Sequence, residues 1–241
     1  MDIHKPHAAK NWREFAVEIG TIVLGILIAL GLEALVEGVH ERRVAAEARE
    51  AVRGEISVNL GMMQRRRQAQ PCVARRLDEL EQVVAAARKG RPYAAPKWVG
   101  RPASLPVTSR RWAAAAQSGR ASLFDSEEQA NYATLYYAME TYSAMQDQEQ
   151  VTWANLRSME GVDAMSPAMV WGLQQALAQA RYEDYRLRLT TFRAFERAAQ
   201  LKIGVTPLQQ VVSSRMDSVC VPIGTDRPTA QRLVGNPVGE P

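Results

Sequence analysis

The sequence predicts an all-α protein in which an N-terminal transmembrane helix continues into an extended helical bundle. Three observations predict this fold. An apolar run near the N-terminus is long enough to cross a bilayer, no proline occurs between His7 and Pro71, and apolar residues beyond the run recur every three or four positions. No segment alternates apolar and polar residues as a strand does. Of the 241 residues 46% are hydrophobic and 23% charged, so the chain can fold around a core.

The apolar run covers residues 15–36, after a short tail of residues 1–14 that we expect in the cytoplasm. At 1.5 Å per residue the run spans roughly 30 Å, the hydrocarbon thickness of a bilayer. Glu18 and Glu33 lie about one turn inside its two ends, near the headgroups. A cleaved signal peptide fits less well, because no Ala-x-Ala-like site follows the run. A buried core helix is the other alternative, but the centre of the run is apolar on every side, which favours lipid.

One face of this run carries small and polar residues. Thr21, Gly25, Ala29 and Glu33 recur every four residues and therefore share one side of a helix. Gly25 and Ala29 form a small-xxx-small pair, which lets another helix approach closely in a membrane. We expect this face to pack against another transmembrane helix, from a second copy or from a larger membrane protein. The alternative is chance, since small residues are common in membrane spans.

From Glu18 to Leu30 the sequence follows the pattern Glu-Ile-x-x-Ile-Val-x-Gly-Ile-Leu-Ile-Ala-Leu. This pattern resembles the start of a group of uncharacterised bacterial single-span membrane proteins, in which a short charged tail and such a span precede a helical domain. The match covers about 20 of the 241 residues. It ends after Leu30, where Gly31-Leu32-Glu33 replaces a polar, Trp-containing exit. The resemblance implies a membrane-anchored bacterial protein, and it implies no activity.

The expected orientation in the membrane depends on domain length and on the cysteines. Within about 15 residues of the run there are three basic residues on each side: Lys5, Lys10 and Arg13 before it, and Arg42, Arg43 and Arg49 after it. This near-balance decides little, but long domains translocate largely regardless of charge. Cys72 and Cys220 suit one disulfide in an oxidising compartment, and two free cytosolic thiols are the alternative. We expect a bacterial inner-membrane protein with a cytoplasmic N-terminus, a periplasmic C-terminal domain and Cys72–Cys220 as a candidate disulfide.

Residues 37–221 are expected to form the bundle. The first helix should run from about residue 10 to 68, with Gly38 as the place for a kink, and project about 45 Å beyond the bilayer. Its residues at heptad-like spacing are Val44, Ala48, Ala51, Glu55, Val58 and Met62. Pro71 should end this helix, and a second helix should follow as far as Gly90.

A long loop is predicted at residues 90–107, which contain four prolines, and further helices should follow it. These helices should start at Thr108-Ser109, at Asp125 with Glu128 three residues later, at Ser166-Pro167 and at Thr206-Pro207, and the first of them should stop at Gly119. The helix that opens at Asp125 carries Tyr132, Tyr142, Glu149 and Trp153 at three- to four-residue spacing. We assign its aromatic stripe to the core rather than to a ligand site; the stripe consists of Tyr132, Tyr136, Tyr137, Tyr142 and Trp153. Residues 222–241 are rich in Pro and Gly and predict a loosely ordered tail.

No motif for catalysis, a cofactor or a metal ion is found in the sequence. The net charge of +4 is too modest to indicate nucleic acid, which we do not expect as a partner. Charge is uneven, however. Residues 65–120 hold thirteen basic and three acidic side chains, and residues 121–170 hold one basic and eight acidic ones. Mutual neutralisation of the two segments is the simpler interpretation, and a basic surface for anionic lipid or an acidic partner is the alternative.

These observations favour a membrane-anchored helical interaction protein, an accessory or scaffold subunit of a bacterial envelope or membrane complex. The expected partners are the lipid bilayer and another transmembrane helix. An extracytoplasmic sensor or small-ligand-binding module is the alternative function. An enzyme is not expected, and we assign no catalytic, cofactor-binding or metal-binding residue.

Overall fold

The computed structural model describes residues 12–207 and 217–235. Within these ranges the fold is all-helical and contains no strand, as the sequence predicts. The elements, in chain order, are α1 (Trp12–Gln68), α2 (Gln70–Arg88), α3 (Arg110–Gln117), the 3-10 helix η1 (Arg120–Leu123), α4 (Ser126–Arg157), α5 (Pro167–Gln200), the 3-10 helix η2 (Ser218–Cys220) and α6 (Arg227–Val234). The predicted long N-terminal helix that continues into a helical domain is confirmed.

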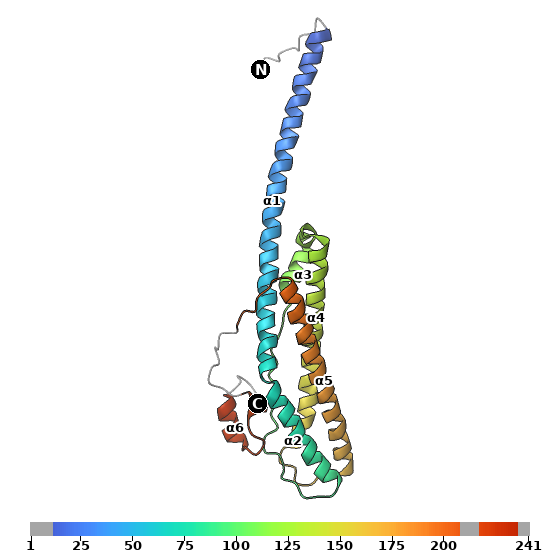
Figure 1. The fold of residues 1–241 in the computed structure, drawn as a ribbon, viewed down its shortest axis with the longest axis vertical. Coiled ribbons are helices and arrows are strands. Elements are labelled where there is room, and N and C mark those ends of the chain that lie inside the picture. Colours follow the sequence, from blue (N-terminus) through green and yellow to red (C-terminus); the bar gives the residue numbers. More distant parts are fainter. Residues whose placement is uncertain (1–11, 208–216, 236–241) are drawn as a thin grey trace, which may run out of the picture.

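α1 protrudes far beyond the rest of the molecule (Figure 1). Its 57 residues form one helix about 85 Å long, which continues through Gly38, where a kink was expected. No residue of α1 before Ala45 is buried. The first part of this helix, roughly 50 Å, therefore makes no core contact, and it is held by hydrogen bonds and an ion pair within α1 itself.

The lower part of α1 packs into the bundle through a face that differs from the predicted one. Ala51 and Val58, which were expected to face inward, are exposed. The buried face consists of Ala45, Ala48, Val52, Ile56, Asn59, Leu60, Met63 and Arg66. Burial follows the larger apolar side chains at positions 52, 56, 60 and 63, because these remove more apolar surface from water than the alanines do.

α4 and α5 are antiparallel and run side by side along the whole bundle (Figure 1). Together with α1, α3 and η1 they enclose one hydrophobic cluster, which includes Ile56, Tyr132 and Tyr136. Together with α2 and the loop before α3 they enclose a second cluster, which includes Leu77 and Trp153. Four residues of the predicted aromatic stripe of α4 thus lie in the core: Tyr132, Tyr136, Tyr142 and Trp153. The prediction is wrong for Tyr137, which is exposed because it lies one residue, about 100° of helix rotation, beyond the buried Tyr136.

Capping residues set the starts of α4 and α5 at the predicted positions. Asp125 accepts a hydrogen bond from the backbone N–H of Glu128 (2.8 Å), and Ser166 caps α5 in the same way. The Glu128 side chain does not complete a capping box, because it accepts two hydrogen bonds from Arg49 (2.6 and 2.8 Å) and one from Tyr132. The Arg49 hydrogen bond lowers the pKa of Glu128. This ion pair fastens the start of α4 to α1.

Pro71 lies in the first turn of α2 and is therefore part of the start of this second helix. α1 ends at Gln68, three residues earlier, because a proline ring clashes with the carbonyl four residues before it. The chain continues into α2 at a changed angle (Figure 1). The predicted loop at residues 90–107 is free of helix and strand.

The prediction of a loosely ordered tail is wrong for residues 222–235. The carbonyl of Ile223 accepts hydrogen bonds from the backbone N–H groups of Lys97 and Trp98 (both 3.0 Å). Asp226 caps α6, and Ala230 of that helix is fully buried. The Pro and Gly residues here form turns and a helix start that pack on the long loop. The predicted helix after Thr206-Pro207 falls mainly on residues 208–216, outside the described residues.

Candidate functional site

The apolar part of α1 is the first candidate for a functional surface. Among the described residues, α1 is the one helix long and apolar enough to cross a membrane, and none of its most apolar stretch is buried. Its large side chains, including Phe15, Ile22, Leu27 and Val36, are exposed around the helix. Contact with a lipid phase would remove this surface from water.

The predicted packing face lies on this part of α1. Thr21, Gly25, Ala29 and Glu33 are all exposed. No atom lies within 4 Å of the position that a Cβ would take at Gly25. The hydroxyl of Thr21 donates to the carbonyl of Val17 one turn earlier (2.9 Å), so it can offer another helix only its acceptor lone pair. The partner of this face stays a prediction.

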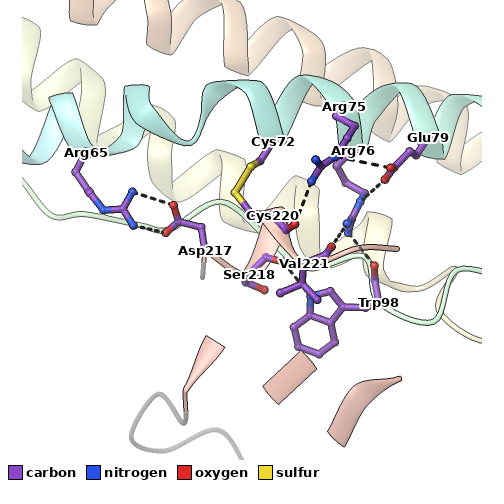
Figure 2. Close-up of a disulfide and its surroundings, with 10 residues drawn as sticks. All are labelled: Arg65, Cys72, Arg75, Arg76, Glu79, Trp98, Asp217, Ser218, Cys220 and Val221. Carbon is purple, nitrogen blue, oxygen red and sulfur yellow. Dashed lines mark hydrogen bonds and ion pairs between the residues drawn. A yellow bond between two sulfur atoms is a disulfide. The ribbon is translucent and has the colours of Figure 1, made fainter. Parts of the chain in front are cut away.

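A disulfide clasp joins the start of α2 to the C-terminal segment (Figure 2). The sulfur atoms of Cys72 and Cys220 are 2.07 Å apart, and their Cα atoms 4.9 Å. An ion pair between Arg65 and Asp217 (2.9 Å) lies on one side of the bridge. On the other side, Arg75 donates to the carbonyl of Cys220 (3.0 Å). The candidate pair from the sequence is thus bonded in the structure.

Arg76 holds three backbone segments together beside this clasp (Figure 2). Its side chain is fully buried and donates to the carbonyls of Trp98 (2.8 Å), Val99 and Val221. Its Nε donates to Glu79 (2.8 Å). Burial lowers the pKa of Arg76, although the Glu79 carboxylate opposes this effect. One guanidinium therefore ties α2, the long loop and the segment after η2 into a single unit.

A second buried arginine lies where α1, α4 and α5 meet. Arg66 donates to Glu149 (2.5 Å), and Asp184 accepts from the same guanidinium at 3.4 Å. Gln70 donates to the other oxygen of Asp184 (2.8 Å). Burial alone would lower the pKa of Arg66, but Glu149 and Asp184 raise it above its ordinary value. Within residues 12–207 and 217–235 no group of His, Cys, Asp and Glu is arranged to hold a metal ion. The geometry indicates a structural tie between three helices.

Sequence reasoning did not single out the two buried arginines. A signal for each was present. Arg66 is three residues beyond Met63 on the buried face of α1, and Arg76 lies among Val73, Leu77 and Leu80 in α2. Glu149 was placed on the inward side of α4, and a carboxylate there requires a cation. The pairing of Arg66 with Glu149 also joins the basic and acidic stretches of the sequence, as the neutralisation interpretation expects.

No protein-family model, curated protein or solved structure matches this chain. The fold and contacts therefore define only a class: an all-helical bundle carried by one long helix that is a candidate membrane span.

Proposed function

We propose that the protein is a single-span bacterial inner-membrane protein that works by interaction, as an accessory or scaffold subunit of an envelope or membrane complex. One observation carries this proposal. A single uninterrupted helix, α1, contains both the exposed apolar segment and part of the buried core of the bundle. The bundle acts through contact and not through catalysis.

The continuity of α1 would couple the span mechanically to the bundle. Ala45, the first buried residue, is nine residues beyond the end of the span at Val36, a distance of about 13 Å along a helix. The bundle would therefore begin close to the membrane surface. Because no flexible loop separates the two parts, a protein that fixes the rotation of the span also fixes the orientation of the bundle. Such coupling is useful in a scaffold.

The proposed orientation has the N-terminus in the cytoplasm and the bundle in the periplasm. The disulfide between Cys72 and Cys220 supports this orientation, because protein disulfides persist in the periplasm and are rare in the bacterial cytosol.

The proposed partner of the span is another transmembrane helix on the Thr21/Gly25/Ala29/Glu33 face. Gly54 lies about eight full turns of α1 beyond Gly25, so the two glycines share one side of the helix. Gly54 is exposed, whereas Val52 and Ile56 face the core. This count puts Gly25 on the same side of α1 as Gly54, opposite the core residues Val52 and Ile56 and next to the segment of Lys202 and Gly204 that follows α5. The span itself has no buried residue, so a partner helix could still pack against it above this segment.

Purification from native membranes in mild detergent tests this proposal, with wild type compared to Gly25→Ile and Ile26→Leu. We expect a stoichiometric membrane partner, or a second copy, to accompany wild type and Ile26→Leu but not Gly25→Ile. Gly25 has no neighbour, so its isoleucine variant should still fold. If all three chains purify with the same partners in the same amounts, the proposed packing face is wrong.

A further inference from the structure

α5 has a second apolar side, which points away from the core. Trp171, Tyr182, Tyr185 and Phe192 are 65%, 53%, 53% and 61% exposed, respectively. The opposite side of the same helix is buried through residues that include Leu173, Leu177 and Leu187. With rings of about 200 Å² each, these four side chains present roughly 500 Å² of largely apolar surface to solvent. The largest apolar patch on a typical soluble domain is of about this size and is often functional.

The spacing of this surface matches the seam of a coiled coil. Trp171, Ala178, Tyr185 and Phe192 are seven residues apart, and Tyr182 and Leu189 lie between them at four-residue steps. A repeat of seven with an intermediate apolar position keeps one stripe in contact with a partner helix along its length. The stripe extends about 32 Å along α5. We call Trp171, Ala178, Tyr182, Tyr185, Leu189 and Phe192 the outer stripe.

The charges beside the outer stripe indicate the chemistry of its partner. Arg186 and Arg193 are seven residues apart and border the stripe on one flank. Arg186 donates to the Tyr182 hydroxyl (2.7 Å) and covers its ring, and in the described part of the chain neither arginine has a carboxylate partner. On the other flank Arg188 lies near Asp184 (3.4 Å). The surface is therefore apolar along its centre and basic on the flank of Arg186 and Arg193, whereas Asp184 partly neutralises the other flank. It ends at Glu196, one turn beyond Phe192.

A second copy of the chain does not fit this surface. If the chain is anchored as proposed, two copies related by an axis along the membrane normal would bring their α5 helices together in parallel. The flank with Arg186 and Arg193 would then face the flank with Arg188 of the other copy. Arg186 and Arg193 would then meet an exposed arginine and no free carboxylate, because Asp184 beside Arg188 is itself buried. A heterologous acidic helix would supply the missing carboxylates.

We propose that the outer stripe of α5 binds an amphipathic helix of a different protein, one with an apolar heptad seam and acidic residues seven apart beside it. This inference rests on the proposed function and names the class of partner for the bundle. The carboxylates of the partner would pair with Arg186 and Arg193, and its apolar seam would cover the exposed rings.

Site-specific photo-crosslinking in membranes of cells that express the full chain tests this proposal. The probe is p-benzoylphenylalanine in place of Tyr185. The matched control is the same probe in place of Tyr137, which is 72% exposed on the outward side of α4. We expect an adduct with another protein at position 185, with little or none at position 137. Mass spectrometry should assign the crosslink to a helical segment with Asp or Glu seven residues apart. Arg186→Glu with Arg193→Glu should lower the adduct yield at least about tenfold.

Four outcomes would overturn the proposal: an adduct between two copies of this chain, equal adducts at both positions, an adduct unaffected by charge reversal, or no adduct. A disulfide that still forms in the charge-reversal variant, seen by gel mobility without reductant, verifies that its bundle is folded. The same membranes washed with alkaline carbonate report on the anchor separately. A chain released by the wash contradicts the proposed membrane anchoring, and the crosslink itself still decides the partner of α5.

Discussion

Removal of the Cys72–Cys220 bridge should destabilise the bundle strongly. The perturbation is the double variant Cys72→Ser/Cys220→Ser, or reduction of the wild type. The two residues are 148 positions apart. A cross-link that closes a loop of this length restricts the unfolded chain by an entropy worth about 5 kcal/mol at 25 °C. The folded state should keep its form, because the buried Arg76 still binds the carbonyl of Val221. Nearly all of the loss should therefore appear as easier unfolding.

Thermal unfolding of the full chain in detergent micelles measures this loss. Near-UV circular dichroism is the suitable signal, because the span stays helical in micelles while the packed aromatic residues of the bundle lose their fixed environment. A loss of about 5 kcal/mol corresponds to a decrease in Tm of roughly 10–20 °C for a domain of this size. Arg75→Ala is the matched control. It removes one exposed hydrogen bond to Cys220 and should lower the stability by about 1 kcal/mol or less.

A double-serine variant that melts within about 2 °C of the oxidised wild type would refute this reasoning, because 1 kcal/mol alone shifts Tm by about that much. It would mean that the bridge does not hold the C-terminal segment in the native fold.

Three further predictions concern the buried ion pair of Arg66 and Glu149, the close packing at Gly100, and the ion pair of Arg49 and Glu128. Glu149→Ala should cost about 3–5 kcal/mol in urea denaturation, since it leaves Arg66 buried with its main partner gone, and a joint Arg66→Met/Glu149→Leu exchange should recover most of the loss. Gly100→Ala should be far more destabilising than Gly90→Ala. Both glycines have positive φ, but of the two only position 100 would bring the new Cβ into overlap with a backbone carbonyl, that of Ser218. Because Arg49 lowers the pKa of Glu128, the ion pair between them should stabilise the fold fully above about pH 4.5, and this stabilisation should be lost as the pH falls below that value. In the Glu128→Gln variant, urea denaturation at a series of pH values should no longer show this loss.

The sequence was sufficient for features that depend on neighbouring residues. Asp125 and Ser166 start their helices as their local patterns predict. The inward side of α4 is buried because aromatic and apolar side chains that recur every three or four residues share one face of a helix, and burial of that face removes them from water. The break before Pro71 also follows from local sterics. These rules act within one helix turn, so no knowledge of the fold is needed.

Features that depend on distant segments could not be predicted in this way. α6 is ordered because Ile223 and Ala230 meet the long loop and its surroundings, and nothing in the Pro/Gly-rich composition shows that contact. The role of Arg76 depends on carbonyls from two other segments. The outer stripe of α5 was not singled out for a different reason: a helix that is apolar on two sides can be buried on both, and only the packed bundle shows which side has no neighbour. The evidence for the Thr21/Gly25/Ala29/Glu33 face is still sequence spacing alone, since within residues 12–207 and 217–235 no other helix lies beside it.

Alkaline carbonate extraction of native membranes tests most directly whether residues 15–36 cross the membrane. The wild-type chain should remain in the membrane pellet. A variant with Leu24→Arg and Leu27→Arg should move to the soluble fraction with its bundle folded, because two arginines near the centre of a span cost about 5–7 kcal/mol of insertion free energy. Release of the wild-type chain by carbonate would contradict the account, because the exposed apolar part of α1 would then have to be covered by protein and not by lipid.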